Sequence, residues 1–190
     1  MKCIKCNREV KLALQNQKVC NSCFCEIIEK RVRKELRLGK YIRKGDSVLI
    51  IDDGSAESRA AIYLLPLLLK DMPFKLLIKK SKYTLGQEFD KSKVIVPWNA
   101  DKEGKYFLSC VFENKKLKFL GNFRLKGKQY IKLFLPCISE EVRSYANIKK
   151  LKFSEVKADK EASFFDNLAK KYPEIKFGFL NASKSFQKKQ

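Results

Sequence analysis

The sequence contains no histidine among its 190 residues. This absence excludes histidine as a general acid or base and as a metal ligand. The chain also lacks a long hydrophobic run, because its most apolar segment, 62–69, contains Pro66 and is too short to cross a bilayer. The N-terminal sequence MKCIKC has none of the features of a secretory signal peptide. We therefore expect a cytoplasmic protein with no membrane partner.

Acidic residues are scarce relative to basic ones. The chain has 42 lysines and arginines against 21 aspartates and glutamates, which gives a formal net charge of +21 and a pI near 9.7. Such a balance favours a polyanionic partner such as nucleic acid. The alternative is that the lysines only keep the surface solvated, since basic residues are spread along the whole chain. The length fits one domain with a small appendage.

Seven cysteines in a chain without an export signal indicate a reducing compartment, where paired cysteines hold metal more often than disulfides. Two Cys-x-x-Cys pairs, separated by thirteen residues that read as a hairpin, comprise Cys3, Cys6, Cys20 and Cys23. Four thiolates on two such knuckles close a tetrahedron around zinc, with Zn–S distances of about 2.3 Å. A disulfide pair, chance spacing or an iron–sulfur cluster are the alternatives. Because four cysteines leave no open position, we expect a structural zinc in a module over 1–25.

Residues 26–38 read as a helix that is apolar on one face and basic on the other, and Gly39 ends it. Together with 40–45 this helix forms a linker between the zinc module and the main domain, 46–190. Such a basic face can bind nucleic-acid backbone, although it can also be merely solvated. The predicted RNA-binding residues are Lys30, Arg31, Arg33, Lys34, Arg37, Arg43 and Lys44, the last two expected beside the loop described next.

Residues 48–58, with the sequence VLIIDDGSAES, have the layout of a phosphate-binding loop. An unbroken apolar run predicts a buried parallel strand, a small-residue turn follows, and apolar residues then recur at helical spacing. Backbone N–H groups at such a helix N-terminus point at an anion. Further strands are predicted over 74–78 and 94–96, the latter ended by Pro97, and helices over 101–112, 139–148 and 160–171. Ser139 is the expected N-cap of its helix, and 117–134 is expected to be a hairpin or an extended crossover. The alternation of strands and helices predicts an α/β fold with a parallel sheet.

Residues 53–58 resemble the PP-loop, written SGGxDS, of ATP-dependent tRNA-thiolating enzymes. Gly54 and Ser58 are kept, whereas Asp53 replaces the first serine, Ser55 the second glycine and Glu57 the aspartate. Segment 97–103 is similar to the family motif GHNxDDE, 132–146 to its KPL…EKEV…YA signature, and 168–180 to its closing helix. The resemblance covers nearly the whole chain. It implies a reduced PP-loop domain of the adenine nucleotide alpha hydrolase-like, Rossmann-like kind behind the four-cysteine module.

The departures from this family concern its chemistry. Catalytic members carry a CxxC between the second and third strands and another cysteine after the YA signature, but 79–93 and 153–158 contain none. Cys110 and Cys137 stand elsewhere and are expected to be buried. The carboxylate of Asp53 would oppose phosphate, so binding of ATP by Asp53, Gly54, Ser55 and Ser58, with Mg²⁺ near Asp101, is expected to be weak or absent.

This pattern resembles the non-catalytic subunit of the cytosolic tRNA 2-thiolation complex. The resemblance implies a role in 2-thiolation of the wobble uridine, with tRNA and a catalytic paralogue as partners. A ubiquitin-related carrier would deliver sulfur through that paralogue. Two alternatives stay open: an active thiotransferase with a diverged loop, in which Gly54 and Ser58 hold phosphate and Asp101 helps to bind Mg²⁺, and a zinc-ribbon nucleic-acid-binding protein outside thiolation.

Overall fold

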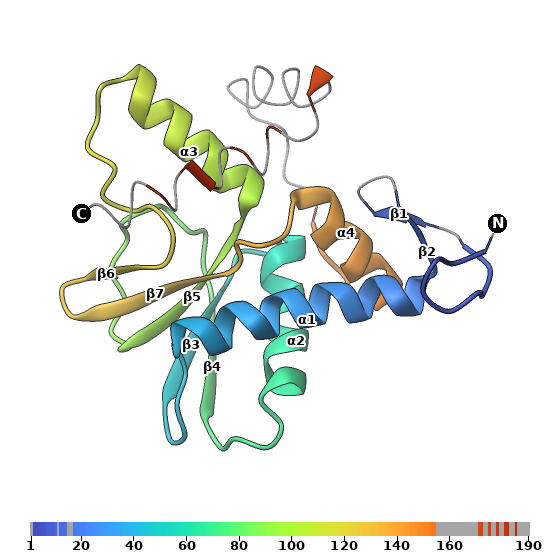
Figure 1. Ribbon diagram of the computed structural model, residues 1–190. Coiled ribbons are helices and arrows are strands. Elements are labelled where there is room, and N and C mark those ends of the chain that lie inside the picture. The colour runs from blue at the N-terminus through green and yellow to red at the C-terminus, as the bar shows by residue number, and fades with distance from the viewer. Residues whose placement is uncertain are drawn as a thin grey trace.

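A computed structural model describes residues 2–10, 12–14 and 17–154, together with 171, 172, 175, 178, 181, 182 and 185. The helix predicted over 160–171 and the family-like segment 168–180 therefore lie almost wholly outside the described residues. Figure 1 shows the chain as a ribbon, with a small hairpin at the N-terminal end and a larger sheet flanked by helices.

The described elements alternate between strands and helices as the sequence predicts. In chain order they are β1 (Leu12–Leu14), β2 (Gln17–Val19), α1 (Asn21–Gly39), β3 (Ser47–Asp52), α2 (Ala56–Leu68), β4 (Lys75–Lys80), β5 (Lys93–Asn99), α3 (Ala100–Phe112), β6 (Phe123–Leu125), β7 (Lys128–Phe134) and α4 (Ser139–Ile148). Five strands form one sheet in the order β4-β3-β5-β7-β6, in which only β6 is antiparallel to its neighbour. The predicted α/β fold with a mostly parallel sheet is confirmed.

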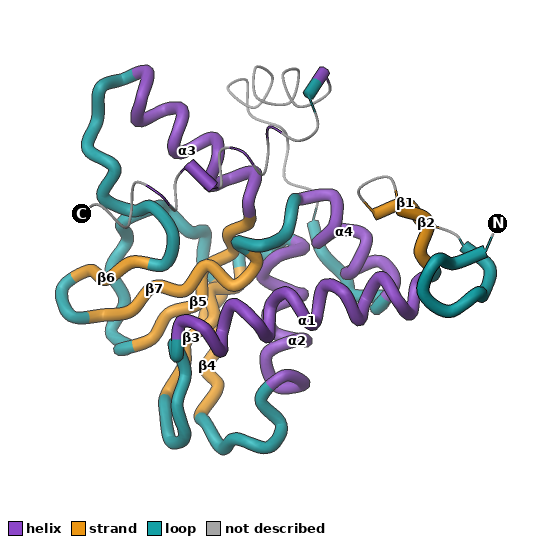
Figure 2. Tube along the Cα trace, in the orientation of Figure 1, coloured by secondary structure: helices purple, strands orange, loops and turns teal. Residues whose placement is uncertain are grey.

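The sheet has a buried cluster on each face because side chains alternate along its strands. Val48 and Ile50 of β3 belong to the cluster that also contains buried residues of α1, α2 and α4. Leu49 and Ile51 belong to a second cluster with Val94, Val96 and Tyr130 of β5 and β7. Figure 2 shows α1 crossing in front of α2, with α4 beside it. Both faces of the central strands are thus covered, as their unbroken apolar runs require.

Two strands are longer than predicted. Pro97 lies inside β5 rather than ending it, and the register between β5 and β7 shifts between Val96 and Asn99. A proline is accommodated at such an irregularity because no ladder hydrogen bond is required from its missing N–H. The basic pair Lys79-Lys80 belongs to β4, an edge strand of the sheet, where exposed lysines are common. The two strands therefore extend beyond their predicted ends, β5 through Pro97 and β4 through Lys79 and Lys80.

Helix α1 begins at Asn21, five residues before the predicted start, and so crosses the expected module boundary at residue 25. Its buried residues include Ile28, Val32 and Leu36, which follow the predicted apolar spacing. The helix ends at Gly39, as predicted, and Lys40 adopts the left-handed conformation with φ 48°. The early start places the second cysteine pair at the N-terminus of α1.

The hairpin alternative for 117–134 is confirmed, since β6 and β7 pair antiparallel across the turn at Lys126-Gly127. The predicted cap of α4 is wrong: Ile138 is the N-cap, and Ser139 is the first helical residue. Glu141 instead helps to cap the N-terminus of this helix, because its carboxylate accepts a hydrogen bond from the Ile138 N–H at 3.0 Å. No helix among the described residues is both long and apolar enough to span a membrane.

Candidate metal centre and phosphate loop

The N-terminal knuckle holds its first cysteine pair in a tight turn beside the hairpin. The Cys3 N–H donates to the Arg8 carbonyl at 2.8 Å, and the Asn7 N–H donates to the Cys3 carbonyl at 2.9 Å. Asn7 takes a positive φ of 58°, a conformation that asparagine tolerates better than most residues. The antiparallel pairing of β1 and β2 then returns the chain to Cys20, which directly precedes α1. The knuckle and the helix start therefore face each other.

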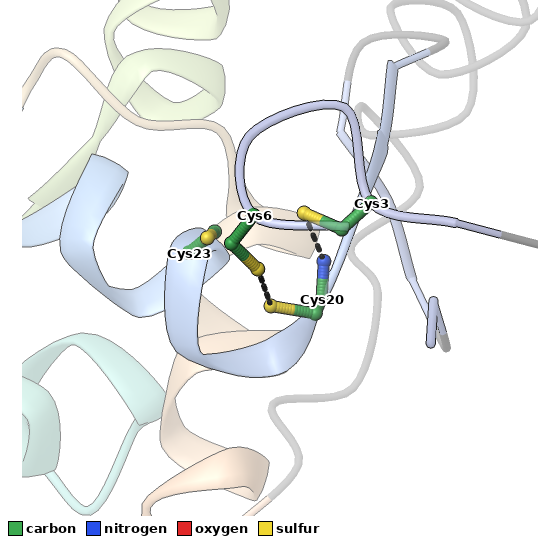
Figure 3. A group of neighbouring side chains, drawn as sticks. All are labelled: Cys3, Cys6, Cys20 and Cys23. Carbon is green, nitrogen blue, oxygen red and sulfur yellow. Dashed lines mark hydrogen bonds between the residues drawn. The ribbon is translucent and has the colours of Figure 1, made fainter. Parts of the chain in front are cut away.

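All four predicted metal ligands come together (Figure 3). The sulfur atoms of Cys3, Cys6, Cys20 and Cys23 lie within 4.8 Å of one another, and the Cys6 and Cys20 sulfurs are 3.4 Å apart. A tetrahedral ion with metal–sulfur bonds of about 2.3 Å separates its sulfurs by roughly 3.8 Å, so the cluster has the size of a single-ion site. Three of the four side chains are buried.

The electrostatics of this cluster also fit a cation. Burial alone would raise the pKa of Cys3, but backbone N–H groups of Cys20, Lys5 and Cys6 lower it to about 6. Interaction with the Cys6 sulfur, followed by burial, raises the pKa of Cys23 to about 12. Sulfurs this close do not all ionise together without compensation, and a metal ion supplies it. Among the described residues no other cysteine or carboxylate cluster of this kind is found.

In the predicted phosphate loop between β3 and α2, the protein's own carboxylates accept the hydrogen bonds of the turn. Asp52 accepts hydrogen bonds from the Gly54 N–H at 3.1 Å and from the Ser58 hydroxyl at 3.0 Å. Asp53 accepts from the Ser55 N–H at 3.0 Å and from the Ser55 hydroxyl at 2.5 Å. Gly54 has φ +81°, which favours glycine at this position. The two N–H groups that an anion would use at the turn therefore already bind anionic oxygens.

The start of α2 is satisfied internally as well. Ser55 is the N-cap, and its hydroxyl accepts from the Ser58 N–H at 3.3 Å. Arg59, one residue further along α2, places a guanidinium nitrogen 3.3 Å from an Asp52 oxygen. Asp52 was not singled out by sequence reasoning, although it follows the buried run directly. Its position at the end of a parallel strand was the available signal.

A second network joins the N-termini of α2, α3 and α4. Asn99 caps α3 by accepting from the Lys102 N–H at 3.0 Å, and its amide donates to the Glu57 carboxylate and to the Ser139 hydroxyl. Asp101 is buried and accepts from the Ser139 N–H at 2.6 Å. The hydrogen bonds of Ser139 to Asn99 and Asp101 thus join α3 to α4. Asp101 is buried in this contact and is not exposed to solvent.

Near this network lies a buried ion pair that the sequence reasoning did not find. Lys132 of β7 and Glu103 of α3 are both fully buried and bonded to each other. Glu103 also accepts from the indole N–H of Trp98 at 2.8 Å, while the Lys132 ammonium lies 4.7 Å from the centre of that ring. Burial lowers the pKa of Lys132, and the negative charge of Glu103 opposes this effect. The pair joins α3 to β7.

Two of the seven predicted RNA-binding residues form ion pairs within the chain. Six of the seven side chains are exposed, namely those of Lys30, Arg33, Lys34, Arg37, Arg43 and Lys44. Arg31 is half-buried and pairs with the buried Glu141 at 2.9 Å. Lys30 pairs with Glu26 at 2.6 Å. The structure contradicts the expected position of Arg43 and Lys44, because they precede β3 whereas the phosphate loop follows its other end. Six residues of strand, about 20 Å, separate the two.

Comparison with known proteins bears on the fold. No protein-family model matches the sequence, and no curated protein matches it significantly. Among solved structures, the U34-tRNA thiolase NcsA from Methanococcus maripaludis with its [4Fe-4S] cluster is similar, with a TM-score of 0.77 and 17% sequence identity. The match covers 98% of this chain and 87% of that one. At this identity the likeness shows that the two chains share a fold.

Proposed function

We propose that this chain is a non-catalytic subunit for 2-thiolation of the tRNA wobble uridine, binding tRNA and a catalytic paralogue. The shared fold with a U34-tRNA thiolase supports the link to tRNA thiolation, since it extends over 98% of the chain. That extent also favours thiolation over a zinc-ribbon protein of another kind, which would share only the N-terminal module. In this proposal a ubiquitin-related carrier supplies sulfur through the paralogue.

The main support for a non-catalytic role is that the backbone N–H groups of the predicted phosphate loop already bind the chain's own carboxylates. The N–H groups of Gly54 and Ser55 bind the carboxylates of Asp52 and Asp53, so a phosphate would have to displace two negative charges. The missing thiols point the same way, because Cys25, Cys110 and Cys137 are buried and lie outside 79–93 and 153–158, where the resemblance places the catalytic cysteines. Burial raises the pKa of Cys25, which makes it a weak nucleophile.

The proposal is tested by measuring 2-thiouridine in tRNA from cells that lack this chain. We expect thiolation to be lost, to return with the wild-type chain, and to return equally with Asp53→Asn, because the loop performs no chemistry. Purification of the chain from its own cells should recover the catalytic paralogue and tRNA. Normal thiolation in the deletion strain would refute the proposed function, and failure of a folded Asp53→Asn variant would favour the active-enzyme alternative.

We further propose that the four-cysteine cluster holds one structural zinc ion. Its sulfurs fit a single ion, whereas a four-iron cluster places an iron in front of each cysteine and holds the sulfurs further apart. Cys3, Cys6, Cys20 and Cys23 would supply all four bonds, which leaves no open position for substrate. The ion would supply folding energy to the knuckle and the start of α1.

Elemental analysis of the purified chain is therefore expected to give about one zinc per chain and no stoichiometric iron. The Cys3→Ser/Cys20→Ser variant should lose this zinc and unfold around the knuckle at a lower temperature. Cys110→Ser is the matched control, since that thiol is buried in α3, and it should keep the metal. Iron with acid-labile sulfide would contradict the assignment, as would full zinc retention in the double variant.

The loop geometry predicts weak binding of ATP. Calorimetry with Mg-ATP is expected to give a Kd above about 1 mM for the wild-type chain. Asp53→Ser/Ser55→Gly removes the opposing charge and opens the turn, so affinity should rise at least about fivefold, while a glycine N-cap costs α2 only a few tenths of a kcal/mol. Asp71→Asn, which removes an exposed carboxylate at the other end of the sheet, should change nothing. Micromolar binding by the wild-type chain would show that the loop still works.

A further inference from the structure

One group of exposed cations lies on the C-terminal part of α1 and at the end of the sheet where β3, β4 and β5 begin. The turn that leads into β3 lies against the start of β4, because the Gly45 N–H donates to the Pro73 carbonyl and the Lys75 N–H donates to the Asp46 carbonyl, each at 2.8 Å. Lys93 at the start of β5 pairs with Asp46. We call the exposed cations here the amino-edge surface, and they are Arg33, Lys34, Arg37, Lys40, Arg43, Lys44, Lys75 and Lys91.

Ion pairs neutralise one half of α1 and not the other. In the part of the helix up to Arg31, Glu26 pairs with Lys30, Glu29 with Lys149 at the C-cap of α4, and Arg31 with Glu141 of α4. In the C-terminal half, Arg33, Lys34 and Arg37 are exposed and make no ion pair within the part of the chain that the structure describes. The helix dipole favours cations at this end. The charge available to an external anion therefore sits where α1 reaches the amino-edge surface.

The opposite end of the sheet carries five carboxylates, four of which are buried. The carboxylates of Asp52, Asp53, Glu57, Asp101 and Glu141 follow the carboxyl ends of the strands or begin the helices there. Two nearby cations pair with these carboxylates, since Arg59 lies 3.3 Å from Asp52 and Lys102 lies 3.5 Å from Glu57, whereas Lys80, Lys82 and Arg143 are exposed. Exposed Lys80 lies opposite Asp52 in the register of β3 and β4. In Figure 1 the turn before β3 is at the lower end of the sheet, while α2 begins at its upper end.

We propose that the amino-edge surface is where this chain holds the RNA backbone. The inference rests on the proposed function and adds a location to it: RNA bound there lies about 20 Å from the chain's own phosphate loop. Exposed lysines and arginines on a helix end and a turn contact phosphates without reading sequence. A nucleotide whose phosphate is held at this surface lies outside this chain's own loop, so in this proposal the reacting base is presented to a site on another protein.

Binding of a tRNA transcript by two paired variants tests this location. Lys75→Gln/Lys91→Gln removes two exposed charges from the amino edge, and Lys80→Gln/Lys82→Gln removes two from the carboxyl end of the sheet. In filter binding at about 0.1 M salt, the first variant should bind roughly tenfold or more weakly, with a salt slope lower by about 2. The second should bind within about twofold of the wild type.

Ultraviolet crosslinking of the wild-type complex gives a measurement that does not depend on variants. Crosslinked peptides should contain 40–44 rather than 79–82. Equal losses in both variants, a larger loss in Lys80→Gln/Lys82→Gln, or crosslinks confined to 79–82 would overturn the location while leaving tRNA binding intact. A wild-type chain that binds no tRNA would overturn both this inference and the proposed function. Normal thiolation in cells that lack the chain would overturn the proposed function alone.

Discussion

Replacing Lys132 by methionine is expected to lower the free energy of unfolding by about 3–5 kcal/mol. The ammonium is fully buried, bonds to Glu103 and donates to the Phe119 carbonyl at 2.6 Å. Methionine fills a similar volume but leaves the Glu103 carboxylate without its cation in a dry site. Glu103 keeps only neutral donors, the Trp98 indole and the Gly121 N–H. Urea unfolding followed by tryptophan fluorescence measures the change, since Trp98 lies in the site.

The pair Lys126–Glu88 provides the control. It joins the same two residue types at 2.7 Å but is exposed, so Lys126→Met should cost less than about 1 kcal/mol. The double variant Lys132→Met/Glu103→Gln removes both charges and should recover part of the loss, which a double-mutant cycle quantifies. A cost for Lys132→Met no greater than that of Lys126→Met would show that the buried pair contributes nothing specific to stability.

The main elements could be predicted because their signals are local. The apolar run of β3, the helical spacing that begins in α2 and the Gly-containing hairpin of β6 and β7 each depend on residues close together in sequence. The metal cluster was predictable for the same reason, since two short knuckles fix their cysteine spacing. Element boundaries failed where a distant contact decides, as when Ser139 binds Asn99 and Asp101 instead of capping its own helix.

The net charge could be counted from the sequence, but which basic side chains are exposed and which are paired could not be predicted. Arg31 and Arg33 are two residues apart on one helix, yet Arg31 binds buried Glu141 and Arg33 is exposed. The partner of Arg31 is 110 residues away, so no local pattern distinguishes the two arginines. The burial of Lys132 could not be predicted from the sequence either, because a lysine inside a strand is expected to face solvent until its carboxylate partner is known. The tertiary structure thus pairs some of the basic residues with buried carboxylates and leaves others exposed.

The salt dependence of tRNA binding should show which arginines and lysines act on phosphate. Each phosphate contact releases condensed counterions, so about six contacts imply a loss of affinity on the order of a thousandfold between roughly 50 and 200 mM salt. Arg33→Gln/Lys34→Gln/Arg37→Gln removes three contacts and should reduce that loss to roughly 40-fold. Binding should weaken alike for every tRNA, because backbone contacts position RNA without specifying its sequence. Filter binding at three salt concentrations measures both effects.

Arg31 is kept in this variant because its replacement would unpair Glu141 and confuse binding with stability. Burial raises the pKa of the Glu141 carboxyl, and the Arg31 guanidinium, 2.9 Å away, lowers it. Arg31→Gln should therefore lower thermal stability, whereas the triple variant should melt like the wild type, since its three side chains are exposed and unpaired within the described residues. If the triple variant binds tRNA with an unchanged salt slope, the end of α1 is a solvated surface, and phosphate contacts must be sought elsewhere.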